Sequence, residues 1–311
     1  MSPVEPTALG GLDASNAPAW NPGRALGPKL VVAIVVLASF ALVALVGRFL
    51  NLDPGAIDVA HIFQPPSMEH WLGTDDAGRD IFMQLIIGAW PSLVVGLSAA
   101  AVAVLIGGTV GILAGYSRGW LDLVLLRVMD YFIVVPALPF AMVITAVWGP
   151  GLGHMILVIA ILLWSTTARV VRAQVKSGRE RLYVIRARML GASHLHVLLR
   201  HILPQALPLI GTTGSLAVAL AILTQAALEF FGLAGTAVLS WGSMIRFAFQ
   251  RDAMLNGAWW MVAPPGICIC IVITACYWLA QCLETALNPR LRTTDLRVRS
   301  FRVLAVSRGE R

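Results

Sequence analysis

Charged residues are scarce in this chain of 311 residues: Asp, Glu, Lys and Arg make up 13% of it, against about 25% in an average soluble domain. Hydrophobic residues make up 58%, and the mean hydropathy is +0.79. A single aqueous core in a chain of this size does not enclose so much apolar surface. The composition therefore excludes a soluble globular protein, a disordered chain and a collagen-like repeat, and it predicts a polytopic, all-α membrane protein.

Cysteine is also rare. The four cysteines lie in or beside the last apolar stretch, at Cys268, Cys270, Cys276 and Cys282. A Cys-x-Cys pair in a continuous helix points its thiols about 200° apart, which does not suit a tetrahedral metal site. We therefore predict reduced thiols that pack as small residues, with no metal bound by this chain.

Six apolar stretches are long enough to cross about 30 Å of hydrocarbon as helices. They cover 30–47, 92–116, 128–148, 153–168, 207–228 and 259–280, and the fourth needs 164–171 as its interfacial end. The predicted organisation is a tail over 1–29, a first transmembrane helix over 30–50, an extracytoplasmic loop over 51–91, a five-helix core over 92–284 with a long inner loop at 172–206, and a basic tail over 285–311. The apolar run at residue 30 starts too late for a cleavable signal peptide.

Lysine and arginine are distributed unevenly about these stretches. With the N-terminus inside, 19 of the 23 fall on the inner side, and the first outer loop is rich in Asp. This asymmetry predicts that both termini are cytoplasmic. The net charge of +7 then reflects topology and argues against nucleic-acid binding, while the basic tail can contact anionic membrane lipid.

Ionisable residues are almost absent from the apolar stretches. Asp130, His154 and Glu229 all fall near predicted membrane interfaces. An ion-coupled secondary carrier needs ionisable groups near the midplane, so this class is disfavoured but is kept as an alternative, as is a membrane scaffold without transport activity. The chain also lacks a Gly-x-x-x-x-Gly-Lys phosphate loop, so we expect that it does not itself use ATP and that the energy for any transport comes from an external partner.

Two spans carry special packing signals. Small residues recur every four positions in the second, at Ala99, Ala103, Gly107, Gly111 and Gly115. Such a stripe predicts close approach of helix backbones. In the third span, Pro136 and Pro139 each remove a backbone hydrogen bond, which predicts either a bent helix that lines a pathway or a purely structural kink.

The loop over 172–206 has helical periodicity of its own. Apolar residues recur at Leu182, Ile185 and Met189, Gly191 interrupts them, and a second set follows at Leu195, Leu198, Leu199 and Ile202 before Pro204, which we expect to stop the run. The pattern predicts a helix, a glycine turn and a second helix. Its narrow apolar face suits either the membrane surface or a groove on a partner.

Several motifs make the chain similar to a known family. YVIRARMLGAS at 183–193 with HILP at 201–204 resembles the Glu-Ala-Ala loop of ABC importer permeases, in the dipeptide, oligopeptide and nickel group. HWLGTDDAGRDI at 70–81 resembles the signature before the second span of the C-type subunit, and FFGL at 230–233, WGSM at 241–244 and LNPRL at 287–291 resemble its later landmarks. The chain departs from the family at Ile185 and Arg186, where the motif has Glu and Ala.

The resemblance implies the type I ABC importer permease fold with six transmembrane helices, in a prokaryotic cytoplasmic membrane. It implies half of a pore for dipeptides or oligopeptides, with nickel chelates or glutathione as alternatives. The implied partners are a second homologous permease, two ATP-binding subunits that hold ATP and Mg²⁺, and an extracytoplasmic substrate-binding protein. No catalytic residue or cofactor is expected in this chain.

The resemblance also assigns roles to residues. The residues expected to contact the ATPase are Tyr183, Arg186, Ala187, Gly191, Ala192, Ser193, His201 and Pro204. Pro136, Pro139 and Glu229 are candidates for the pathway. The acidic cluster Asp75, Asp76 and Asp80 lacks the full calcium-loop pattern. We therefore expect it to lead into an amphipathic helix through Ile81, Phe82, Leu85 and Ile86, on a surface that by analogy meets the binding protein.

Overall fold

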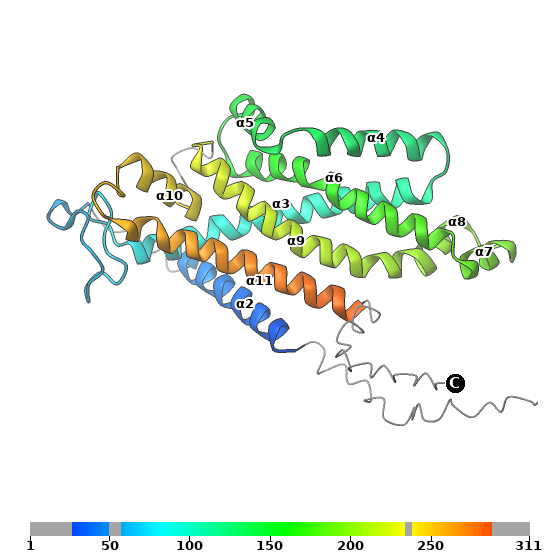
Figure 1. Ribbon diagram of the computed structural model, residues 1–311, viewed down its shortest axis with the longest axis horizontal. Coiled ribbons are helices and arrows are strands. Elements are labelled where there is room, and N and C mark those ends of the chain that lie inside the picture. Colours follow the sequence, from blue (N-terminus) through cyan, green and yellow to red (C-terminus); the bar gives the residue numbers. More distant parts are fainter. Residues whose placement is uncertain (1–26, 50–56, 234–237, 288–311) are drawn as a thin grey trace, which may run out of the picture.

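The computed structural model describes residues 27–49, 57–233 and 238–287. They form a bundle of long helices and contain no β-strand within those ranges (Figure 1). The predicted all-α membrane fold is confirmed. Five helices are long and apolar enough to cross a membrane, or six if one bent pair counts as a span. The tail over 1–26 and the basic tail from residue 288, including most of the LNPRL landmark, lie outside the described residues.

Three long helices form the centre of the bundle. They are α3 (Ile81–Tyr116), α6 (Leu152–Arg179) and α9 (Leu203–Phe230). The pair α2 (Gly27–Phe49) and α11 (Ala263–Leu287) covers one side, and α4 (Trp120–Val134) with α5 (Ala137–Trp148) covers the opposite side (Figure 1). All four cysteines lie on α11 and none is in a disulfide.

The small-residue stripe of α3 packs directly on α6. A Cβ atom added to Gly107 would lie 2.5 Å from the carbonyl oxygen of Trp164, and one added to Gly111 would lie 2.6 Å from that of Ala168. Gly115 repeats the arrangement one turn later, against Arg172 at 2.7 Å. The prediction of close backbone approach is confirmed, because no larger side chain fits between the two helices.

The second span is longer than predicted. We expected the span to begin at residue 92 and an amphipathic helix to start at Ile81. Instead α3 runs unbroken from Ile81 through Pro91, so the outer loop ends at Asp80. The Asp80 carboxylate caps the helix by accepting hydrogen bonds from the backbone N–H groups of Phe82 and Met83, at 2.7 and 3.2 Å.

The third span, predicted as one stretch over 128–148, is two helices. α4 ends at Val134 and α5 begins at Ala137, and their axes differ by 91°. Val135 and Pro136 between them have extended backbone angles. Pro136 has no N–H group and disfavours helical geometry in the preceding residue. The backbone hydrogen bonds of α4 therefore end at this point, and the chain turns sharply.

The fifth span corrects another prediction. Pro204 does not stop the preceding helical run. It lies in the first turn of α9, and one continuous helical segment extends from His194 to Phe230. The π-helical turn η3 (Leu198–Ile202) accommodates the N–H group that Pro204 lacks. In this turn the N–H of Leu203 donates to the carbonyl of Leu198. The fourth span also exceeds its predicted end, since α6 continues to Arg179.

Short elements close the end of the bundle near residue 80. They are η2 (Val59–His61), α10 (Trp241–Gln250) and η4 (Trp259–Met261). Trp241 anchors α10 to α3: its backbone N–H donates to Ser92 Oγ at 3.0 Å, and its indole N–H donates to the carbonyl of Leu85 at 3.0 Å. The last span begins at Trp259 as predicted, with a 3₁₀ turn over 259–261 before α11 starts at Ala263.

Candidate coupling surface

The loop between α6 and α9 contains the predicted helix, glycine turn and helix. They are α7 (Leu182–Met189), Gly191 and α8 (His194–Val197). Both helices lie at one end of the bundle (Figure 1). Six of the eight residues assigned to ATPase contact lie between the start of α7 and the start of α8: Tyr183, Arg186, Ala187, Gly191, Ala192 and Ser193. His201 lies in the π turn, and Pro204 lies at the start of α9.

The turn has a defined geometry. Gly191 has φ +87°, a left-handed conformation that favours glycine. Its N–H donates to the carbonyl of Arg188 and that of Ala192 donates to the carbonyl of Ala187, both at 3.0 Å, which is the Schellman pattern at a helix C-terminus. Ser193 then caps α8, because its Oγ accepts a hydrogen bond from the N–H of His196 at 3.2 Å.

The predicted apolar face of α7 is exposed, as expected of a face that meets the membrane surface or a partner. Met189 is 75% exposed and Leu182 is 72% exposed, whereas Val184, which the periodicity did not select, is completely buried. Val184 packs with Val171 and Val175 of α6 and with Val197 of α8. The valines therefore fix the loop to the bundle and turn the larger apolar side chains outward.

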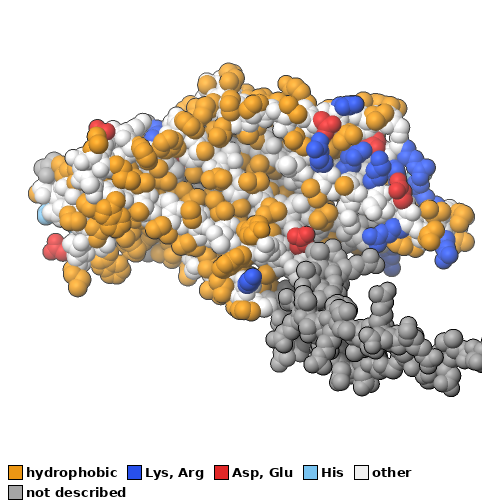
Figure 2. Space-filling model, in the orientation of Figure 1, with side chains coloured by type: hydrophobic (Ala, Val, Ile, Leu, Met, Phe, Trp, Pro, Cys, Tyr) orange, Lys and Arg blue, Asp and Glu red, His pale blue; other side chains and the backbone are white. Residues whose placement is uncertain are grey.

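The outward side chains lie on both sides of the turn. We call this set the coupling surface, and it consists of Leu182, Tyr183, Ile185, Met189, Leu190, Leu195 and Leu199. Leu190 is 89% exposed. Lysine and arginine side chains gather at the same end of the molecule, as Figure 2 shows. An exposed apolar group of this kind within a basic rim is typical of a protein interface.

Polar contacts also fix this loop to the end of α3. The Tyr116 hydroxyl lies 2.9 Å from His194 Nδ1, and Arg188 Nη2 lies 2.6 Å from the same nitrogen. The guanidinium of Arg179 donates to the carbonyl oxygens of Tyr116 and Ser117, at 3.1 and 2.7 Å. The sequence analysis did not identify Tyr116, and no local pattern could have placed it beside a residue 78 positions away.

The three pathway candidates are far from this surface. Pro136 precedes α5 and Pro139 lies in its first turn. Glu229 is 1% exposed near the end of α9. Its two carboxylate oxygens accept hydrogen bonds from Gln225 Nε2 at 3.0 Å and from Ser240 Oγ at 2.5 Å, so the structure places it in an enclosed polar network between α9 and α10.

The acidic residues of the outer loop have structural partners. Asp75 Oδ1 accepts from the backbone N–H groups of Ala77 and Arg79, and Asp80 caps α3. Asp76 forms an ion pair with Arg251. In the described part of the chain, no group of three or more His, Cys, Asp or Glu side chains has the geometry to hold a metal ion.

Comparison with known proteins agrees with this architecture. The family described as binding-protein-dependent transport system inner membrane component matches residues 107–293. The chain is 34% identical to a dipeptide transport system permease protein of Alkalihalophilus pseudofirmus, over 85% of this chain and 86% of the relative. It is also 34% identical to an oligopeptide transport system permease protein of Bacillus subtilis, over 86% of this chain and 85% of the relative.

A third relative carries a different substrate name. It is a glutathione transport system permease protein of Pectobacterium atrosepticum, 33% identical over 76% of this chain and 78% of the relative. The family match covers more than half of the chain, and the first two relatives cover most of it. The chain therefore belongs to the family of inner membrane components of binding-protein-dependent transport systems, the permeases of ABC importers.

Proposed function

We propose that the chain forms half of the translocation pore of an ATP-driven importer for dipeptides or oligopeptides. A second permease supplies the other half, two ATP-binding subunits dock on the coupling surface and its counterpart, and a substrate-binding protein delivers the solute. The observation that carries the proposal is the coupling surface itself, an exposed apolar group on a loop that the bundle holds rigidly.

The anchoring of the loop explains how it would transmit force. Val184, Val197 and Ile202 join α7 and the following turns to α6 and α9 in one buried cluster. A partner that moves α7 and α8 must therefore move the ends of two spans with them. Rigid-body motion of packed helices needs no charged group inside the membrane, which suits a chain with so few of them.

The same reasoning gives the orientation. Because the ATPases are cytoplasmic, α7 and α8 face the cytoplasm, and η2 and α10 face the outside. The basic residues at the end of α6, which include Lys176 and Arg179, then lie on the cytoplasmic side, in accord with the positive-inside rule.

The assignment of a peptide substrate rests on the names of the relatives. One relative is named as a permease for dipeptides and another as a permease for oligopeptides. A third is named as a permease for glutathione, which is a modified tripeptide. Nickel chelates are the further alternative. Competition of unlabelled dipeptide, glutathione and nickel–histidine against labelled dipeptide uptake separates these substrates.

An ion-coupled carrier is the rival function. The acidic groups of α4 are already paired: Asp130 pairs with Arg169, and Asp122 Oδ1 accepts from Arg172 Nε at 2.6 Å. The buried Glu229 is also hydrogen bonded. None of these three side chains is available to a coupling ion without losing a partner, and ion-driven uptake by this chain reconstituted alone would establish the rival.

The direct test introduces charge on the coupling surface. In the Leu190→Asp variant, a carboxylate must be desolvated for the ATPase to dock, so we expect ATP-dependent uptake in proteoliposomes to fall at least about 10-fold. Leu255→Asp is the matched control, because Leu255 is 85% exposed at the opposite end of the molecule. Equal uptake by the two variants, with the ATPase retained in both purified complexes, would contradict the proposal.

A further inference from the structure

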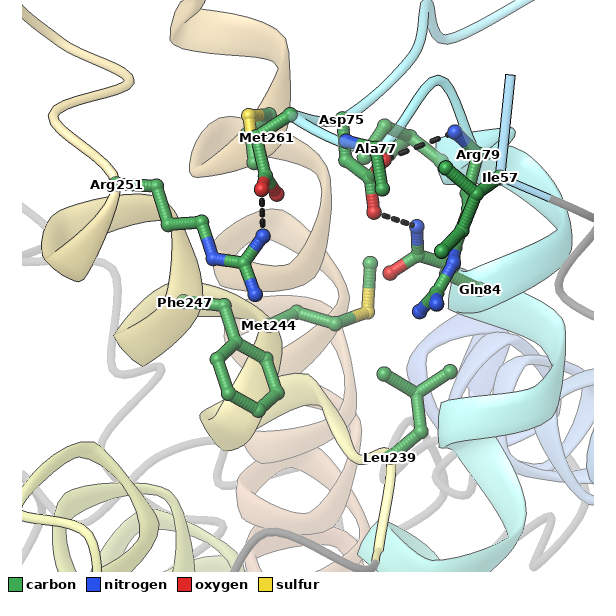
Figure 3. Close-up of a pocket in the computed structure, with 12 residues that line it drawn as sticks. Ile57, Asp75, Ala77, Arg79, Gln84, Leu239, Met244, Phe247, Arg251 and Met261 are labelled. Atoms are coloured by element: carbon green, nitrogen blue, oxygen red, sulfur yellow. Dashed lines mark hydrogen bonds and ion pairs between the residues drawn. The ribbon is translucent and has the colours of Figure 1, made fainter. Parts of the chain in front are cut away.

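A cavity of about 330 Å³ lies at the end of the bundle opposite α7 and α8. The segment before α3 forms one wall, and α10 forms the other (Figure 3). Its ionisable side chains are Asp75, Asp76, Arg79 and Arg251, and Met244 and Phe247 contribute apolar surface. The volume is within the range of small-molecule sites, about 300–1,000 Å³.

Both carboxylates in this cavity are already engaged. Asp75 Oδ1 accepts two backbone hydrogen bonds at 2.8 Å, and its Oδ2 accepts one from Gln84 Nε2 at 2.7 Å. Asp76 forms an ion pair with Arg251 across the opening. Figure 3 shows these contacts on two sides of the cavity. The two acidic groups are thus neutralised or fully hydrogen bonded, and they leave little free acceptor capacity for a cation.

Arg79 differs from its neighbours. Its Nε is buried and has no hydrogen-bond partner, and its guanidinium makes no ion pair with any residue of the described ranges. A buried donor without a partner is destabilising, because its hydration is lost without replacement. The cavity therefore holds a cationic side chain whose buried Nε has no partner among the described residues.

We propose that this cavity binds the carboxylate of a small peptide through the guanidinium of Arg79. The planar guanidinium matches a carboxylate with two parallel hydrogen bonds, which a neutral amide cannot reproduce. Met244 and Phe247 face an apolar side chain of the same ligand. The identity of the ligand as a peptide rests on the proposed function, and its location makes the cavity an entry site on the outer face.

The test uses the assembled importer in nanodiscs, without the binding protein. The probe is radiolabelled alanyl-phenylalanine, with its C-terminal amide as competitor. We expect the free acid to compete well and the amide poorly. Arg79→Gln should weaken binding of the acid roughly 10- to 100-fold, the effect of losing a hydrogen-bonded ion pair. Arg118→Gln, which removes an exposed arginine at the other end, is the control.

Two further variants cover the case in which Arg79→Gln does not assemble. Arg79→Lys keeps the charge but loses the forked geometry, so binding should weaken less than in the glutamine variant. Ala77→Leu keeps Arg79 and fills part of the cavity, so it should weaken binding of the acid. Equal competition by acid and amide, or unchanged binding in these two variants, overturns the proposal.

A second experiment distinguishes a peptide carboxylate from a carboxylate of the binding protein as the partner of Arg79. A carboxylate side chain on the binding protein would bring the same chemistry. If Arg79→Lys leaves dipeptide binding unchanged but weakens docking of the binding protein, the peptide site is refuted. ATP-dependent uptake with the binding protein present is measured separately. Uptake without discrimination between acid and amide refutes this inference alone, whereas carboxylate binding without uptake refutes the proposed function.

Discussion

The hydroxyl of Tyr116, the last residue of α3, lies 2.9 Å from Nδ1 of His194, the first residue of α8. Arg188 of α7 completes the cluster, with Nη2 donating to the Tyr116 hydroxyl at 3.2 Å. α3 extends from this point to the outer cavity and packs on α2, α6 and α9 along its length. The coupling loop is thus bonded to a third span besides the two that it connects.

Removing the Tyr116 hydroxyl tests this third connection. In Tyr116→Phe the ring remains but the hydrogen bonds to His194 and Arg188 are lost, so we expect uptake per ATP hydrolysed to fall roughly 2- to 10-fold, the effect of about one hydrogen bond. The measurement is the ratio of uptake to phosphate release in proteoliposomes. Tyr131→Phe is the control, because the Tyr131 side chain is exposed on α4. An unchanged ratio in Tyr116→Phe would mean that α3 takes no part in coupling.

The contact between α3 and α6 predicts a position-specific loss of stability. In Gly111→Ala, the new methyl group would lie 2.6 Å from the carbonyl oxygen of Ala168 and 2.8 Å from Val171 Cβ, so the helices must separate. We expect a cost of about 1–3 kcal/mol, visible as a lower melting temperature in detergent.

Gly108 provides a close control for this substitution. It precedes Gly111 by one turn on the same helix, but an added Cβ would have its nearest neighbour, Ile210 Cδ1, at 4.0 Å. Gly108→Ala should therefore be neutral or slightly stabilising, because alanine favours the helix. Equal melting temperatures for the two variants would refute the packing argument.

The enclosed position of Glu229 predicts an ordering of variants. Glu229→Gln retains an acceptor for Ser240 or Gln225, whereas Glu229→Leu removes the acceptor from both donors. Gln225 Nε2 and Ser240 Oγ then keep only their longer contacts, at 3.4 and 3.2 Å. We expect the leucine variant to lose about 1–3 kcal/mol more than the glutamine variant. Thermal unfolding of the purified permease pair measures this difference. Glu284→Leu, on the exposed side of α11, should have little effect.

Gly191 predicts a backbone effect on coupling. The space around this residue is open, since an added Cβ would meet no atom within 4 Å, but its φ of +87° strains any other residue by about 1–2 kcal/mol. Gly191→Ala should therefore shift the turn and lower ATP-dependent uptake several-fold. Gly211→Ala, in equally open space within α9, should retain full uptake. If both variants transport equally well, the geometry of the turn does not matter for docking.

Much of the architecture was predictable because membrane helices are local structures. Length and apolarity located the spans, the four-residue spacing of glycine identified the close face of α3, and Gly191 marked the turn. Helix ends were less predictable. Pro136 breaks its helix, whereas Pro204 does not, because a π turn accommodates the missing N–H group only at the second site.

The orientation of the coupling loop needed the tertiary structure. Periodicity selected Leu182, Ile185 and Met189 as a face for the membrane surface or a partner, and all three side chains are exposed. It did not select Val184, which is buried against Val171 and Val175 of α6 and anchors the helix. Sequence periodicity shows which residues share one face of a helix. It does not show on which face the rest of the protein packs.

The sequence alone determined an all-α membrane protein with a helical loop between its fourth and fifth spans, because hydropathy and periodicity act over short stretches of chain. Only the tertiary structure decided that Tyr116 meets His194, that Glu229 is enclosed and that Arg79 lines a cavity with its Nε unpartnered among the described residues. Such contacts join residues from helices that are distant in sequence. They depend on how whole helices pack against one another, which no local pattern encodes.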